Sequence, residues 1–115
     1  METKNAVKAL AALAHESRMV AYRHLMQAGP GGLQAGQLAD LLEIPPSSLS
    51  FHLKELMNAD LLDSRQEGRY VIYSVKFQSM SELLSFLTEN CCGGNLCISV
   101  SMDPCARSEA LIDNH

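Results

Sequence analysis

At 115 residues the chain has room for one hydrophobic core but not for two, so the sequence predicts a single compact domain. No apolar run approaches the roughly 20 residues that cross a bilayer, and no basic leader opens the chain, so we expect a soluble, cytoplasmic protein with no membrane partner. A formal net charge of −4 argues mildly against nucleic-acid binding, because phosphate contacts normally leave a basic surface.

The acidic residues gather in the C-terminal third of the chain. Residues 46–76 hold four basic and four acidic side chains, whereas from residue 77 onward one arginine stands against five acidic residues. The net charge therefore leaves DNA binding by the central part of the chain open.

Two helices are predicted in the N-terminal quarter. Residues 5–13 are rich in Ala and Leu and are apolar over much of a helical surface, which suggests burial against a partner chain. The segment 15–17 (His-Glu-Ser) precedes a second helix that runs to about Met26, and residues 29–32 (Gly-Pro-Gly-Gly) form a loop after it.

A helix-turn-helix pattern occupies residues 34–56. Residues 34–42 repeat apolar side chains at helical spacing, and the proline pair 45–46 ends that helix. A second helix starts near Pro46, which suits a first helical turn. Its apolar residues then follow at spacings of four and three along one face: Leu49, Leu53 and Leu56.

Small polar residues occupy the other side of this second helix, which presents Ser48, Ser50, His52 and Glu55. Because the second helix of such a motif enters the major groove of DNA, we expect contacts from Ser47, Ser48, Ser50 and His52. The alternative is purely structural, with serines that only cap the helix and a histidine that only packs.

Two strands are predicted behind that helix, over residues 62–66 and 69–75, and Glu67 and Gly68 join them in a two-residue turn that uses the positive φ open to glycine. A hairpin at this place is the wing of a winged helix. Arg65 and Arg69 lie near its tip and are expected to reach the DNA backbone or the minor groove.

The last predicted helix runs from Ser79 to about Asn90, and its apolar stripe consists of Met80, Leu83, Leu84, Phe86 and Leu87. The fold class is therefore mainly α with a β-hairpin wing. We expect the DNA-binding domain over residues 1–92 and a cysteine-containing tail over residues 93–115.

Four segments together resemble a known family: residues 12–18 (Ala-Leu-Ala-His-Glu-Ser-Arg), 37–39 (Gln-Leu-Ala), 47–56 (Ser-Ser-Leu-Ser-Phe-His-Leu-Lys-Glu-Leu) and 68–73 (Gly-Arg-Tyr-Val-Ile-Tyr). Over about residues 5–90 the chain resembles the ArsR/SmtB family of metal-responsive repressors. The resemblance implies a winged helix-turn-helix homodimer joined through its first and last helices. It also implies a repressor, with no enzymatic activity, that occupies a palindromic operator and leaves it when an inducer binds.

Inducer sites differ within this family, and two of its patterns are missing here. Residues 34–45 contain no cysteine, and residues 77–90 contain neither Asp nor His. The pattern that matches resembles arsenite sensors with paired cysteines at the end of the last helix and another beyond, and here these are Cys91, Cys92 and Cys97. The resemblance implies trivalent arsenic, such as arsenite, as the inducer.

The chemistry of the cluster supports that assignment. Thiolates are soft ligands that select thiophilic centres, and trivalent arsenic takes three sulfurs in a pyramid. Adjacent cysteines on a helix point about 100° apart, so Cys91 and Cys92 alone make no compact site. Gly93 and Gly94 would stop the helix and let the chain bring Cys97 back towards the pair. We do not expect Cys105 to be a ligand.

Other readings stay open on the sequence alone. The paired cysteines could be a buried apolar contact, a thiol switch that responds to oxidation, or a site for zinc or cadmium. A thiol oxidoreductase is poorly supported, because no Cys-x-x-Cys follows a strand in a βαβ unit. A winged helix used only for protein contacts would lack salt-dependent DNA binding.

Overall fold

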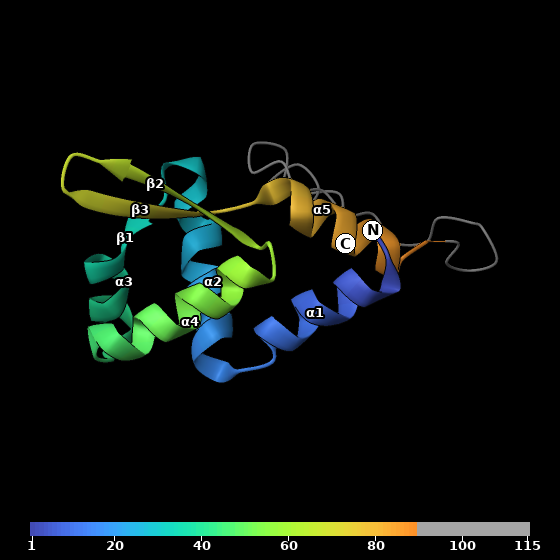
Figure 1. Cartoon of the computed structure of the whole chain (residues 1–115), viewed down its shortest axis with the longest axis horizontal. Helices are drawn as coiled ribbons and strands as arrows, with labels where there is room; N and C mark the ends of the chain where they lie inside the picture. The colour runs from blue at the N-terminus through green and yellow to red at the C-terminus, as the bar shows by residue number, and fades with distance from the viewer. Residues whose placement is uncertain (90–115) are drawn as a thin grey trace, which may run out of the picture.

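The computed structural model describes residues 1–89. The elements follow in the order α1 (Thr3–Leu13), α2 (Glu16–Ala28), the 3-10 turn η1 (Gly29–Gly31), β1 (Leu33–Gln34), α3 (Ala35–Leu42), α4 (Pro46–Asn58), β2 (Leu62–Glu67), β3 (Tyr70–Val75) and α5 (Phe77–Leu87). The hairpin of β2 and β3 projects at one end of the molecule, and α1 and α5 lie against each other at the other end (Figure 1). The predicted fold class, mainly α with a β-hairpin wing, is confirmed.

Leucines form the centre of the core. The largest fully buried side chains are Leu25, Leu38, Leu49, Leu53, Leu56, Leu61, Leu62 and Leu83. Three of these come from α4, which packs against α1, α2, α3 and β2. Since burying one leucine contributes roughly 1.5–3 kcal/mol, these three side chains hold α4 firmly in one rotational setting about its own axis.

The sheet has three antiparallel strands, with β3 between β1 and β2. The extra strand β1 was not predicted, because its two residues, Leu33 and Gln34, are too few to show a periodicity of two. It pairs with Tyr73 and Ile72 of β3 and so ties the segment before α3 to the base of the wing.

The wing turn differs by one residue from the prediction. Glu67 pairs with Tyr70, so the turn consists of Gly68 and Arg69 rather than Glu67 and Gly68. Gly68 has a φ of +65°, whereas Arg69 does not have a positive φ. This is the pattern of a type II′ turn, which needs glycine at its first central position. Arg69 therefore sits in the turn itself and not at the start of a strand.

The last helix starts two residues earlier and ends three residues earlier than predicted. It begins at Phe77, because the backbone carbonyl of Lys76 at the N-cap accepts hydrogen bonds from the backbone amides of Ser79 and Met80. At its other end the Leu84 carbonyl accepts hydrogen bonds from both the backbone amide and, over 2.8 Å, the hydroxyl of Thr88, which closes the last turn of the helix. The expected boundary between residues 92 and 93 lies outside the described residues.

The apolar surface predicted for the first helix is divided between two environments. Ala6, Ala9 and Leu13 are buried in the core of the same chain, whereas Val7 and Leu10 remain exposed. No helix within residues 1–89 is long and apolar enough to cross a membrane.

Gly32 is the glycine on which the junction of loop and sheet depends. Its φ is +71°, and a Cβ there would overlap the Tyr73 carbonyl oxygen and lie 2.9 Å from Ile72 Cγ2. We expect Gly32→Ala to lower the free energy of unfolding by about 2–4 kcal/mol, through strain and overlap together. Urea unfolding measures the change.

The matched control is Gly31→Ala in the same loop, because a Cβ on Gly31 meets nothing within 4 Å and its φ is not in the left-handed region. We expect that variant to unfold within about 0.5 kcal/mol of the wild type. Equal losses in the two variants would contradict the close contact between this loop and β3.

Candidate nucleic-acid interface

The turn between α3 and α4 sets the angle at which α4 leaves the core. Glu43 adopts a left-handed conformation with φ 55°, and its amide donates to the carbonyls of Ala39 and Asp40. Pro45 is extended at the N-cap, and Pro46 occupies the first helical position, where no amide hydrogen is needed. The two helices form a helix-turn-helix, as the sequence predicted.

The outward face of α4 is defined by the buried leucines. With about 100° between successive residues, the positions on the side opposite the stripe of Leu49, Leu53 and Leu56 include those of Phe51, Lys54 and Ser47. All three are exposed, and the Phe51 side chain keeps 57% of its accessible surface. Ser48 and Ser50 are exposed on either side of this line.

The structure therefore corrects the face expected from the sequence. Ser47, Ser48 and Ser50 are accessible as predicted, but His52 and Glu55 are only half-exposed. His52 lies on a flank of α4 nearer the leucine stripe, where its ring meets that of His15. Phe51 and Lys54 were missed, although the same angular argument applied to the leucine stripe identifies them. DNA contact by the serines and by His52 stays a prediction.

His52 packs against the turn between α1 and α2. Its ring centroid lies 4.7 Å from that of His15, whose Nδ1 accepts a hydrogen bond from the Ser17 amide and so caps α2. Among the described residues, Nδ1 of His52 is buried and has no hydrogen-bond partner. Burial, followed by the proximity of His15 and of Arg18, lowers the pKa of His52 below its ordinary value.

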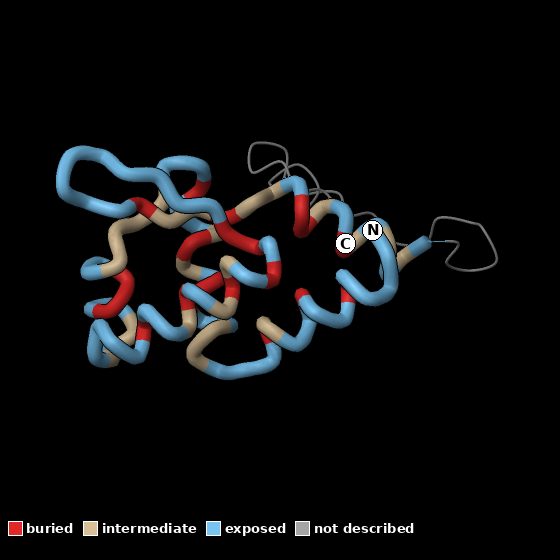
Figure 2. The backbone as a smooth tube through the Cα atoms, viewed as in Figure 1, coloured by how far each residue is buried: buried red, intermediate tan, exposed pale blue. Residues whose placement is uncertain are grey.

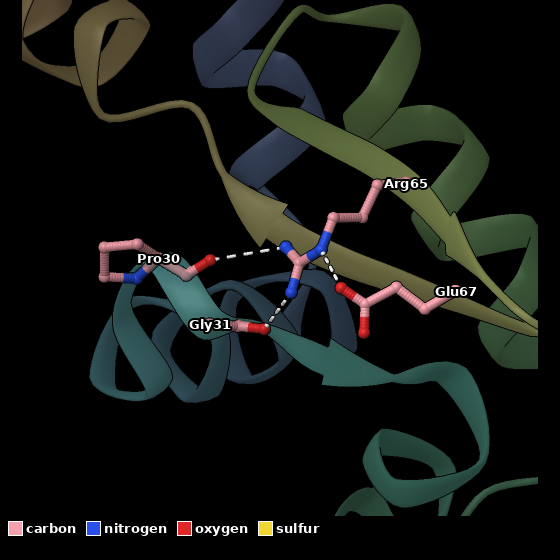
Figure 3. A network of polar contacts seen from close by, with 4 residues as sticks. All are labelled: Pro30, Gly31, Arg65 and Glu67. Atoms are coloured by element: carbon pink, nitrogen blue, oxygen red, sulfur yellow. Dashed lines mark hydrogen bonds and ion pairs between the residues drawn. The ribbon is translucent and has the colours of Figure 1, made fainter.

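Arg65 is occupied by contacts within its own chain (Figure 3). Its Nε donates to the Glu67 carboxylate over 2.7 Å, Nη2 donates to the Gly31 carbonyl over 2.9 Å, and Nη1 donates to the Pro30 carbonyl over 3.4 Å. These bonds join the wing to the loop after α2. We infer that Arg65 orients the wing, which competes with the phosphate contact that the sequence suggested for it.

Two of the four basic residues between positions 46 and 76 are thus engaged with carboxylates. Lys76 pairs with Asp60 and lies 3.8 Å from an oxygen of Asp63. The hydrogen bond to Asp60 raises the pKa of Lys76 and lowers that of the carboxyl. Within this segment Lys54 and Arg69 remain, and no ion pair joins either one to another described residue.

The tip of the wing is exposed as a whole, from Asp63 to Val71 (Figure 2). Arg69 is exposed in its turn, next to Tyr70, which keeps 54% of its surface. An arginine at this place is suited to a phosphate or to the minor groove, as predicted for Arg69. The prediction for the cysteines, Cys91, Cys92 and Cys97, lies outside the described residues.

A recognition-type helix with an exposed polar face, followed by an antiparallel hairpin, defines the class of the protein as a winged helix-turn-helix protein. A family model described as a helix-turn-helix domain matches residues 13–65. The chain is 32% identical over 81 residues to the arsenical resistance operon repressor of Bacillus subtilis (strain 168), which covers 70% of this chain and 73% of that protein.

Solved structures agree with this assignment. HlyU from Vibrio cholerae N16961 superimposes with a TM-score of 0.60 at 34% identity, over 76% of this chain and 97% of that one. An ArsR-like transcriptional regulator from Rhodococcus sp. RHA1 shares the fold, with a TM-score of 0.65 at 24% identity over 73% and 76% of the two chains. The chain belongs to the ArsR family of DNA-binding transcriptional regulators.

The different surroundings of Arg65 and Arg69 lead to different expected effects on DNA binding. Arg69→Gln should remove a phosphate contact. The negative slope of the logarithm of the DNA association constant against the logarithm of salt concentration should then become smaller in magnitude by about one per protomer. Arg65→Gln should weaken binding at every salt concentration, because the wing loses its anchor, but leave the slope unchanged. Fluorescence anisotropy with a labelled duplex at several salt concentrations measures both slopes.

A reduced slope for Arg65→Gln would show that this arginine contacts phosphate and that the bonds to Pro30 and Gly31 give way on DNA. An unchanged slope for Arg69→Gln would show that the tip of the wing does not contact DNA phosphate.

His52 makes stability depend on pH. Above its ordinary pKa of 6.5 the imidazole is neutral in the folded and the unfolded chain alike, so it contributes no pH dependence there. As the pH falls below that value the unfolded chain binds the proton first, because the pKa in the folded chain is lowered. The free energy of unfolding should therefore fall as the pH is reduced from about 7 to 5.

His52→Gln should show a smaller loss of stability over the same interval, measured by urea unfolding at closely spaced pH values. A wild-type protein that gains stability on acidification through this range, relative to the variant, would contradict the lowered pKa.

Proposed function

We propose that this protein is a transcriptional repressor that binds operator DNA as a homodimer and releases it when trivalent arsenic bridges Cys91, Cys92 and Cys97. The observation that carries the DNA-binding part is the exposed outer face of α4, with three serines at its N-terminal end and a projecting wing behind it. Such a helix fits the major groove, and the hairpin reaches the neighbouring backbone.

The dimer is supported by apolar side chains that one chain leaves uncovered. Val7 and Leu10 on α1 keep 59% and 43% of their surface, and Leu87 near the end of α5 keeps 53%. Because α1 and α5 lie side by side, a second copy could cover both helices at once. The two copies of α4 would then address half-sites about 34–36 Å apart, one turn of DNA.

Two observations support arsenic as the inducer. One is the cysteine cluster itself, with three thiols within seven residues. The other is the similarity to a protein named for arsenical resistance, of which this chain covers 73%. In the proposed step three thiols replace the three hydroxyls of arsenious acid, so that three As–S bonds form, three molecules of water leave and the complex is neutral.

The proposed coupling runs through α5. Residue 91 follows the end of this helix by four positions, so ligation of the cysteines would act on the C-terminal end of α5. At its other end α5 is tied to the turn after α4, because the Asp60 carboxylate accepts hydrogen bonds from Lys76 and, over 3.4 Å, from Ser79. A shift of α5 at the dimer interface would thereby change the spacing of the two recognition helices.

The test uses the reduced full-length chain and a fluorescent operator duplex. Arsenite should release the wild type, whereas Cys91→Ser and Cys92→Ser should each raise the arsenite concentration for half release at least tenfold, because a two-sulfur complex loses one As–S bond. Cys105→Ser is the matched control and should respond as the wild type does. Release that is unchanged in both cysteine variants would refute the arsenic site.

The same titration distinguishes the other signals. Release by peroxide without arsenite would assign a redox switch, and release by zinc or cadmium alone would assign a divalent-metal sensor. Either result would change the proposed inducer, but it would not affect the proposal that α4 binds DNA.

A further inference from the structure

Phe51 is the most exposed aromatic side chain of the helix that we propose for the major groove. It keeps 57% of its surface, and its ring centroid lies 5.8 Å from that of His52 in a T-shaped arrangement. It takes no part in the core, which the leucines of the same helix complete. A single exposed apolar residue is ordinary on a protein surface, so exposure alone does not indicate a function for Phe51. Its position on α4 does.

That position is the middle of the outward face. Phe51 lies one turn after Ser47 and about one turn before Lys54, directly opposite the leucine stripe. It is five residues beyond Pro46, which places it about 7.5 Å along the helix from its start. The residues in the N-terminal part of a recognition helix are those that reach base edges, so with α4 in the major groove Phe51 would face the floor of the groove rather than its phosphate walls.

The major groove offers an apolar side chain one specific partner. Base edges there are hydrogen-bond donors and acceptors, with the exception of the thymine C5-methyl group, which is apolar and stands out into the groove. The serines beside Phe51 have no single preferred base, because a hydroxyl both donates and accepts. Compared with the serines on this face, the phenyl ring is therefore better able to discriminate between bases, and it would select thymine, whereas Lys54 on the same face would favour guanine.

His52 also limits the freedom of that ring. The two rings meet edge to face, and His52 is itself held against His15, which caps α2. A side chain that is already restricted loses less entropy when it binds. The contact with His52 thereby favours an outward orientation of the phenyl ring before DNA arrives.

We propose that Phe51 is a specificity-determining residue that recognises thymine through its C5-methyl group in each half-site of the operator. This inference rests on the proposed DNA-binding function and adds to it the base that is recognised and the residue that recognises it.

The experiment removes the methyl group from the DNA and the ring from the protein in turn. A randomised duplex library is enriched on the reduced wild-type chain, and in the enriched duplex each thymine is replaced by deoxyuridine, which differs only by the methyl group. At one thymine or more per half-site, wild-type binding should weaken about fourfold, the value of burying one methyl group. Phe51→Ala should bind the thymine duplex more weakly and bind the two duplexes equally.

Two further variants separate this contact from a general loss of binding. Phe51→Leu keeps an apolar side chain and should retain part of the preference for thymine. Ser47→Ala, on the same face, should keep the full preference even where its overall affinity falls. Far-ultraviolet circular dichroism of each variant checks that α4 is intact.

The outcomes are distinct. Equal binding of thymine and deoxyuridine duplexes by the wild type, or an unchanged preference in Phe51→Ala, overturns the assignment of Phe51 and leaves DNA binding in place. Failure of the library to enrich any duplex, at low salt and in the reduced protein, overturns the proposed function together with this inference.

Discussion

Burial of the leucine stripe on α4 is the constraint on which the rest of the structure depends. Leu49, Leu53 and Leu56 are at most 1% exposed, and α1, α2, α3 and β2 all pack against the helix that carries them. Rotating α4 by even one residue would expose a leucine and bury a polar side chain, at a cost of several kcal/mol. The outward face is therefore determined by the core and not by the polar residues that occupy it.

The candidate interface contains few basic side chains that are free of ion pairs. Arg65 and Lys76 are paired with carboxylates of their own chain. The bonds of Arg65 to the carbonyls of Pro30 and Gly31 hold the wing in place, and the pair of Lys76 with Asp60 holds the start of α5. The cations left for DNA in the segment from α4 to the wing are Lys54 and Arg69. An acidic protein can bind DNA in this way if the few free cations lie where the backbone passes, and its binding should depend less steeply on salt than that of a strongly basic protein.

The helices and the wing could be predicted because their signals are local. Leucines at spacings of four and three, the proline pair at 45–46 and a glycine in the hairpin turn each act within a few residues. The exact turn could not, since the pairing of Glu67 with Tyr70 is decided by the register of the whole hairpin. The strand β1 was missed because two residues show no periodicity, and it exists only through its pairing with β3.

In the candidate site, too, some features follow from local sequence patterns and others depend on contacts between distant residues. Exposure of the three serines follows from the leucine pattern, as does exposure of Phe51, although only polar residues of this helix were predicted to contact DNA. The contacts of Arg65 with Pro30 and Gly31 join positions more than 30 residues apart in sequence, so no local pattern could indicate them. The stack of His52 on His15 likewise depends on how α4 packs against the turn before α2.

The most direct test of the central claim, that the outer face of α4 and the tip of the wing bind DNA, is a nitrogen-15 NMR titration of the reduced protein with the enriched duplex. We predict that the largest changes in amide shifts fall on Ser47 to Lys54 and on Gly68 and Arg69, and that residues 77–87 of α5 change less. Changes centred on α1 and α5, with the amides of α4 unmoved, would contradict the account.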